Sequence, residues 1–193
     1  MKRRILVAGG AGFVGRRLVR ALRDEHEVCV LDLLKFGNRF SADDNANITL
    51  EKVDIRDPHS VAAVMERFRP EIVVHLAAIH FIPECEGDPL HAEDVNVLGT
   101  INLLRACPDG TRFVFASSGA VYRPDEVPHD ELRSAVEPAD VYGFTKLHAE
   151  HYVRYFVRQR SLSGAIVRLF NVIGPGETSP HLLPEWRRWT VGC

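Results

Sequence analysis

The chain of 193 residues has little cysteine, and its cysteines lack the spacing of a metal or redox motif. Cys29, Cys85, Cys107 and Cys193 are scattered without a CxxC pair, which argues against a disulfide framework and favours reduced thiols in a cytoplasmic protein. The nine histidines include no HExxH spacing. We therefore expect no metal site.

The chain also lacks a strong excess of one charge and a long apolar run. Its formal net charge of −2 gives no basic footprint for nucleic acid, and we interpret Arg16, Arg17, Arg20 and Arg23 as a solvated helix face. No stretch approaches the length of a transmembrane helix. Glycines interrupt the start "MKRRILVAGGAGFVG", so it predicts a strand and a glycine loop rather than a signal peptide. We expect neither nucleic acid nor membrane as a partner.

Short apolar runs alternate with amphipathic stretches, a pattern typical of βαβ units and a parallel sheet. The runs "IVVHLA" and "FVFAS" are apolar almost throughout, as expected when helices cover both faces of a sheet. The length suits one domain of α/β class. The predicted strands lie near Arg4–Ala8, Glu27–Leu31, Ile48–Lys52, Ile72–Leu76, Arg112–Ser117 and Ala165–Leu169. The predicted helices lie near Phe13–Asp24, Ser60–Phe68, Pro89–Ala106 and Val141–Arg158.

A glycine loop directly follows the first predicted strand. Gly10, Gly12 and Gly15 have the GxGxxG spacing, and Gly9, Gly12 and Gly15 have the GxxGxxG spacing. Such glycines allow a tight turn, close approach of the backbone to a pyrophosphate, and close packing of helix on strand. Asp32 ends the second strand, where its carboxylate can bind a ribose 2′-hydroxyl and would repel a 2′-phosphate. The loop therefore predicts binding of NAD rather than NADP.

Tyr142 and Lys146 are four residues apart on a predicted helix and so share one of its faces. A free tyrosine has a pKa of about 10, and a nearby lysine charge favours the phenolate that a base requires. The pair is thus a candidate acid–base centre. An alternative is a packed tyrosine beside a lysine that pairs with Glu150, again four residues along.

Several motifs in register resemble those of extended short-chain dehydrogenases/reductases of the NAD-dependent epimerase/dehydratase family. They are "GGAGFVG", "VDIRD", "HLAA", "VNVLGT", "FASSGAVY", "YGFTK" and "RLFNVIGPG". The resemblance implies a Rossmann-type, doubly wound parallel sheet that binds NAD. It also implies a nucleoside-diphosphate sugar as substrate, UDP- or dTDP-linked.

The resemblance implies three catalytic residues. Tyr142 would take a proton from a substrate hydroxyl, Lys146 would support its phenolate, and Ser118 would steady the developing carbonyl oxygen. The implied substrate contacts are Ser118, Tyr142 and Asn171. The implied cofactor contacts are Gly9, Gly12, Phe13, Val14, Gly15, Asp32, Asp54, Ile55, Leu76, Ala77, Ala78, Asn96, Ser117, Tyr142, Lys146 and Phe170.

Gly119 and Ala120 stand where dehydratases and decarboxylases of the resembled family carry carboxylates. Their small side chains disfavour water elimination and decarboxylation. We therefore expect a 4-epimerase that oxidises the sugar transiently to a 4-keto form. Two alternatives are a non-catalytic NAD-binding protein and an NAD-dependent dehydrogenase or reductase of a sugar or non-sugar alcohol.

The family-like motifs extend to about Gly176. We expect residues 1–176 to form the NAD-binding domain and residues 177–193 to be a short atypical tail, a remnant of a mostly absent carboxy-terminal substrate domain. We expect sugar binding and turnover to be impaired as a result. The predicted helices Pro89–Ala106 and Val141–Arg158 carry more apolar surface than one sheet-facing stripe requires, which favours a homodimer or, equally, a thick intramolecular core.

Overall fold

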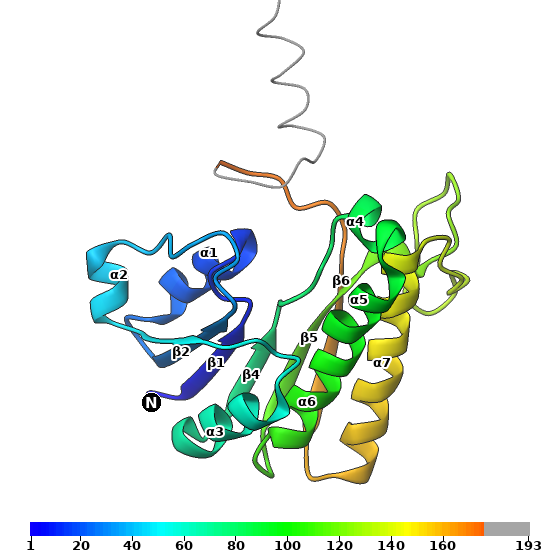
Figure 1. Ribbon diagram of the computed structural model, residues 1–193. Coiled ribbons are helices and arrows are strands. Elements are labelled where there is room, and N and C mark those ends of the chain that lie inside the picture. The colour runs from blue at the N-terminus through cyan, green and yellow to red at the C-terminus, as the bar shows by residue number, and fades with distance from the viewer. Residues whose placement is uncertain (176–193) are drawn as a thin grey trace, which may run out of the picture.

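The apolar runs of the chain form one six-stranded parallel sheet in the computed structural model, which describes residues 1–175 (Figure 1). The strand order is β3-β2-β1-β4-β5-β6, and Val7 of the first strand pairs with Val30 on one side and Val74 on the other. This confirms the Rossmann-type fold. The strands are β1 (Arg4–Ala8), β2 (Glu27–Asp32), β3 (Thr49–Lys52), β4 (Ile72–His75), β5 (Arg112–Ser118) and β6 (Ser163–Leu169).

Helices join the strands and cover the sheet. They are α1 (Phe13–Leu22), α2 (Ala42–Ala46), α3 (Pro58–Phe68), α4 (Ile82–Gly87), α5 (Pro89–Glu93), α6 (Gly99–Ala106) and α7 (Val141–Gln159). A π-helical segment, η1 (Asp94–Leu98), joins α5 to α6, and a 3-10 turn, η2 (Gly119–Val121), follows β5. The prediction of one helix over Pro89–Ala106 was therefore wrong for its central residues, which are π-helical and separate α5 from α6. The short α2 and α4 were not predicted.

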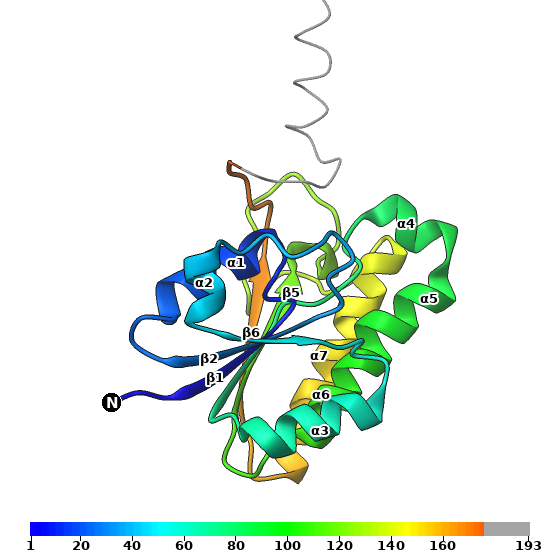
Figure 2. The ribbon, with the colours of Figure 1, turned by 60° about the vertical axis from the view of Figure 1, so that its left-hand side comes forward.

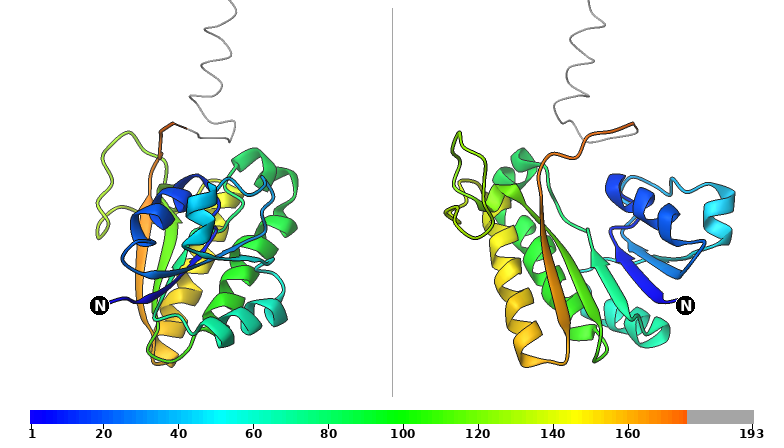
Figure 3. Two further views of the ribbon diagram at one scale, coloured as in Figure 1. Left: turned by 90° about the vertical axis from the view of Figure 1, so that its left-hand side faces the viewer. Right: turned by 180° about the vertical axis from the view of Figure 1, so that it is seen from behind.

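The two faces of the sheet are covered unequally. Residues of α3, α6 and α7, such as Met65, Leu103 and Val153, form one apolar core with Phe113 and Phe115 of β5. A smaller core lies on the other face, where α1 covers β1 and β2. On that second face no helix among residues 1–175 covers β5 and β6 (Figures 2 and 3).

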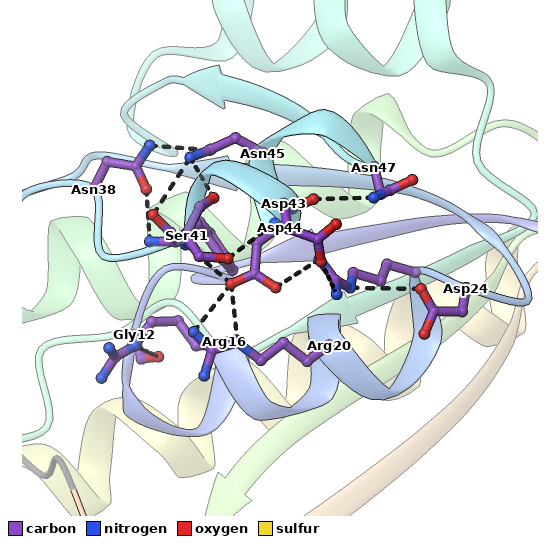
Figure 4. Close-up of polar contacts among 12 residues, drawn as sticks. Gly12, Arg16, Arg20, Asp24, Asn38, Ser41, Asp43, Asp44, Asn45 and Asn47 are labelled. Carbon is purple, nitrogen blue, oxygen red and sulfur yellow. Dashed lines mark hydrogen bonds and ion pairs between the residues drawn. The ribbon is translucent and has the colours of Figure 1, made fainter.

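The arginines of α1 do not all form the solvated face that we expected. Asp44 of α2 is only 2% exposed and lies 3.0 Å from Arg20 Nε and 2.8 Å from Arg23 Nη1 (Figure 4). Burial raises the pKa of Asp44, but hydrogen bonds from Ser41 and Arg20 outweigh burial and lower it overall. These contacts fasten α2 to α1, and distance along the chain hid the pairing in the sequence.

Candidate active site

The glycine loop lies at the carboxyl edge of the sheet, between strands that lead to opposite sides. The chain proceeds from β1 to β2 on one side, whereas β4 is the neighbour of β1 on the other, which makes this point the switch in topology where such sheets bind ligands. Gly9 has a φ of +79°, and a Cβ there would lie 2.5 Å from the backbone nitrogen of Ala77. The loops after β1 and β4 therefore touch, with Leu76 and Ala77 at the contact.

The other two glycines shape a cradle at the start of α1. A Cβ on Gly15 would lie 2.7 Å from Cα of Gly10, and a Cβ on Gly12 would lie 3.2 Å from the Gly9 carbonyl oxygen. Gly12 is the N-cap of α1 and provides no side-chain hydrogen bond, so the first-turn N–H groups of Phe13 and Val14 remain available to an anion. This arrangement fits the pyrophosphate of a dinucleotide.

Asp32 ends β2 beside this cradle. Its Oδ2 accepts a hydrogen bond from the Ala11 N–H at 3.0 Å, and its Oδ1 accepts one from the Leu34 N–H at 2.8 Å. The carboxylate is thus fixed against the backbone of the glycine loop. Its negative charge at this position suits a ribose with a free 2′-hydroxyl.

Two of the predicted cofactor contacts, Asp54 and Ile55, differ in exposure. Asp54 accepts a hydrogen bond from Arg56 Nη2 at 2.6 Å, and the Arg56 guanidinium lowers the pKa of that carboxyl. Ile55 is only 6% exposed and packs in the core against Gly99, where a Cβ would lie 2.5 Å from Ile55 Cδ1. The Ile55 side chain therefore serves the packing of α6, and a cofactor contact at this residue would involve its backbone.

Tyr142 and Lys146 lie in the first two turns of α7, which the Asp140 side chain caps by accepting a 2.7 Å hydrogen bond from Gly143 N–H. Lys146 is 3% exposed, and its Nζ lies 4.7 Å from the centre of the Phe115 ring and 5.9 Å from that of Tyr142. Burial lowers the pKa of Lys146 to about 8. The pair therefore meets inside the protein rather than in solvent.

Ser118 ends β5 and faces Tyr142. Burial raises the pKa of Tyr142 to about 12, and a hydrogen bond with the Ser118 side chain acts against that rise. Ser118 Oγ also accepts a 3.1 Å hydrogen bond from Ala120 N–H, which fixes the start of the η2 turn. The fold thus brings together Ser118, Tyr142 and Lys146.

Asn96 lies in the π-helical segment and ties two parts of the site together. It is 1% exposed; its Oδ1 accepts from Ile79 N–H at 2.8 Å, and its Nδ2 donates to Ile79 O and Thr145 Oγ1, both at 2.9 Å. Thr145 stands immediately before Lys146 on α7. Asn96 therefore fixes the loop after β4 against the helix that carries Tyr142 and Lys146, and π-helical turns are common at such sites.

Glu150, which the alternative interpretation paired with Lys146, has other partners in the structure. It is fully buried and accepts hydrogen bonds from Ser117 Oγ at 2.6 Å, Arg168 Nε at 2.8 Å and Arg154 Nη2 at 2.8 Å. No ion pair with Lys146 forms among residues 1–175. The sequence indicated these ion pairs only through the four-residue spacing from Glu150 to Arg154. Arg168 lies in β6, too far along the chain for a local pattern to predict its pairing with Glu150.

Ser117 and Ser118 point in different directions because successive strand residues face opposite sides of a sheet. Ser117 is 3% exposed and its hydroxyl is bound to Glu150. The donor of the Ser117 hydroxyl is therefore used within the protein, and its cofactor contact stays a prediction. The hydroxyl anchors the end of β5 to α7.

Phe170 and Asn171 follow β6 at the same edge of the sheet, and both are exposed. The Phe170 ring lies 5.9 Å from the His129 ring and 6.4 Å from the Tyr122 ring, roughly parallel to both. The predicted substrate side of the site is therefore open.

Among residues 1–175, no three side chains of His, Cys, Asp or Glu gather into a group that could hold a metal ion. No helix in the same range combines the length and apolar character needed to cross a membrane.

The sequence and fold were compared with those of known proteins. The model of the NAD dependent epimerase/dehydratase family matches residues 5–189. UDP-glucose 4-epimerase of Lactobacillus helveticus is 34% identical over 89% of this chain and 52% of its own length. GDP-6-deoxy-D-talose 4-dehydrogenase of Aggregatibacter actinomycetemcomitans is 32% identical over 94% of this chain and 57% of its own length. The crystal structure of UDP-glucose 4-epimerase from Thermus thermophilus in complex with NAD matches with a TM-score of 0.82 and 34% identity, covering 92% of this chain and 58% of that one. The chain therefore spans little more than half the length of these proteins.

Proposed function

The chain belongs to the NAD-dependent epimerase/dehydratase family, and from this premise we propose that it is a nucleoside-diphosphate-sugar 4-epimerase. The observation that carries the proposal is the gathering of Ser118, Tyr142 and Lys146 at the sheet edge that also holds the glycine cradle. The substrate would be a UDP- or dTDP-linked sugar. UDP-glucose 4-epimerases among the relatives support this class.

Gly9, Gly12, Gly15 and Asp32 would hold NAD by its pyrophosphate and adenosine ribose. When bound, the oxidised nicotinamide supplies the hydride acceptor for the alcohol carbon of the sugar. Return of the hydride to the other face of the keto sugar inverts that carbon. The protein residues hold the sugar oxygen and move its proton.

Tyr142 is the proposed base for the sugar hydroxyl. Its pKa of about 12 in the structure is too high for that role at neutral pH, so the phenolate requires added positive charge. Lys146 supplies one positive charge close by, and the oxidised nicotinamide ring adds another when it is bound. Ser118 donates to the oxygen as negative charge develops on it.

The dehydrogenase alternative rests on a specific comparison. The 4-dehydrogenase relative is about as similar to this chain as the epimerases are, and it shares the same requirement for a base at the sugar hydroxyl. A dehydrogenase or reductase would release its keto or alcohol product instead of returning the hydride to the same molecule. A protein that binds NAD without catalysis is the third candidate.

We propose residues 1–176 as the NAD-binding domain. The expected tail, residues 177–193, lies outside the described residues. Because the matched relatives are almost twice as long, we expect this chain alone to bind the sugar weakly while it still binds the cofactor.

We also propose a homodimer in the cytoplasm. Leu98 of η1 and Phe144, Tyr152 and Tyr155 of α7 are each between 41% and 55% exposed, an apolar row that a second copy could cover. Sedimentation should show a dimer that Tyr152→Glu disrupts. The free thiols of the buried cysteines suit a reducing compartment.

The test of the proposed function is turnover of nucleotide sugars by the purified chain. It is incubated with NAD and with UDP-, dTDP-, GDP- and CDP-sugars, and the 4-epimers are measured. Tyr142→Phe should abolish turnover while the chain still binds NAD through the glycine cradle and Asp32. Release of NADH with an alcohol would favour a dehydrogenase, whereas tight NAD binding with no turnover would favour the non-catalytic candidate.

A further inference from the structure

Gly119 lies beside Ser118, and the space next to its Cα is filled by an aromatic ring. A Cβ placed on Gly119 would lie 2.6, 2.7 and 2.8 Å from three carbons of the Phe170 ring. Real Cβ atoms do not approach other atoms so closely, so a side chain at position 119 would have to push the ring away. The φ of Gly119 is not in the left-handed region, and its backbone would therefore accept alanine.

The Phe170 ring is not free to move without loss. It stacks with His129 and Tyr122, whose own rings are 4.7 Å apart and tilted by only 12°. Arg168 lies 4.7 Å from the centre of the Tyr122 ring, and Glu150 fixes that guanidinium with two hydrogen bonds. A displaced Phe170 ring would lose its aromatic contacts with a group that is anchored in the core.

We propose that Gly119 and Phe170 form an interlocking pair that determines reaction specificity at the proposed sugar site, an inference that rests on the proposed epimerase function. The ring occupies the volume that a side chain at position 119 would need. The wall beside Ser118 is consequently apolar and contains no second acid or base from that position.

The chemistry explains why such a wall matters. An oxidised sugar can lose water only if one group removes a carbon-bound proton and another protonates the departing hydroxyl. A carboxyl group at position 119 would stand next to the Ser118 hydroxyl and could take part in that proton transfer. Gly119 carries no side chain and the Phe170 ring fills the adjacent space, so position 119 supplies no such group.

A double-mutant cycle in thermal stability tests the interlock without any need for turnover. Gly119→Ala should lower the Tm by about 3 °C or more because it overpacks the ring. In the Phe170→Ala background, the same change should leave the Tm unchanged or raise it, because alanine restricts the unfolded chain more than glycine does. Equal shifts in both backgrounds, or no loss in the wild-type background, would overturn the interlock.

Gly87 provides the matched control. It ends α4, its φ is not in the left-handed region, and no atom lies within 4 Å of an added Cβ. Gly87→Ala should therefore not lower the Tm. A loss equal to that of Gly119→Ala would show that the cost arises from glycine replacement in general, and it would also refute the pair.

The sugar assay tests the role of the pair in specificity. Gly119→Ala should lower kcat/KM for 4-epimer formation at least tenfold, and part of this loss should be recovered when Phe170→Ala is added. The same loss in both backgrounds would refute the role. If the unmodified chain turns over no sugar, the proposed function fails, and with it the specificity role, while the Tm cycle still decides whether the interlock exists.

Discussion

Replacement of Glu150 by glutamine should be among the most destabilising changes of one functional group in this protein. The Glu150 carboxylate is fully buried, and Arg168, whose side chain is 14% exposed, binds both of its oxygens at 2.7 and 2.8 Å. Removing one partner of a buried ion pair costs about 3–5 kcal/mol, because the other charge remains without compensation. Arg154 is 42% exposed and adds little to this figure.

Urea unfolding followed by circular dichroism at pH 7 measures the effect. The expected loss corresponds to a fall in Tm of roughly 6–20 °C for a domain of this size. Glu93→Gln is the matched control, because Glu93 is half-exposed and bonds His148 Nδ1 at 3.0 Å, a surface contact worth less than about 1 kcal/mol. A loss below about 1 kcal/mol for Glu150→Gln would refute the argument from burial.

The pH dependence provides a second check on Glu150. Burial raises the pKa of its carboxyl, but the hydrogen bonds from Arg168 and Ser117 outweigh burial, so the pKa in the folded protein lies below its ordinary value of about 4.3. A lowered pKa contributes stability above the unfolded pKa, and that contribution disappears as the pH falls through the folded pKa. The difference in stability between wild type and Glu150→Gln should therefore shrink below about pH 4. A difference that stays constant down to about pH 3 would contradict the charged state.

Three further changes probe the cofactor side of the site. Gly15→Ala should raise the Kd for NAD more than tenfold in a fluorescence titration, because the added methyl would lie 2.7 Å from Cα of Gly10 and close the cradle. An unchanged Kd would contradict the steric argument. Asn96→Ala should lower the free energy of unfolding, measured with urea, by about 1–3 kcal/mol, because it leaves buried polar groups of the loop after β4 without partners. A loss near zero would show that those groups find other partners. Asp32→Asn should shift the ratio of the Kd values for NAD and NADP at least tenfold toward NADP, because it removes the charge that repels a 2′-phosphate; an unchanged ratio would exclude Asp32 from the ribose site.

The sequence predicted best the elements whose stability is local or strongly patterned. The predicted bounds of β1 agree with the structure, and α7 was predicted to within one residue at its end. Both are long or strongly apolar runs bounded by clear signals, the glycine loop and the Asp140 cap. The glycine motif likewise predicted the cradle that the structure contains.

Elements held by distant partners could not be predicted in the same way. The short helix α2 has no apolar period, and it is held by a capping box at Ser41 and by ion pairs from Arg20 of α1 and from Arg23, the C-cap of α1. The π-helical segment breaks a pattern that looked regular, because Asn96 turns inward to bond Ile79 and Thr145. The capping box has a local signature, Ser41-x-x-Asp44, but the ion pairs of α2 and the Asn96 bonds join distant residues and have none.

In the candidate site, too, local motifs predicted some side-chain positions, whereas contacts between distant residues could not be predicted. The motifs indicated Tyr142 and Lys146 as a pair, but they left open whether Lys146 pairs with Glu150. The structure decides this point, because Ser117, Arg154 and Arg168 together satisfy the Glu150 carboxylate. The direction of the Ser117 hydroxyl depended on the strand register, which the motif does not state.

Cofactor binding and sugar binding in the proposed reaction depend on different parts of the chain. The glycine cradle, Asp32 and the Asn96 bonds all lie within residues 1–175, so the proposed cofactor contacts belong to groups that the structure describes. The substrate side differs, because Phe170 is 60% exposed and Ile173 is 57% exposed directly after β6. With Val172, which is 44% exposed, they form a run of exposed apolar side chains, and contiguous exposed apolar surface marks interaction or ligand sites. NAD affinity and sugar turnover should therefore respond separately to mutation, and a variant that changes sugar affinity alone should map to the segment after β6.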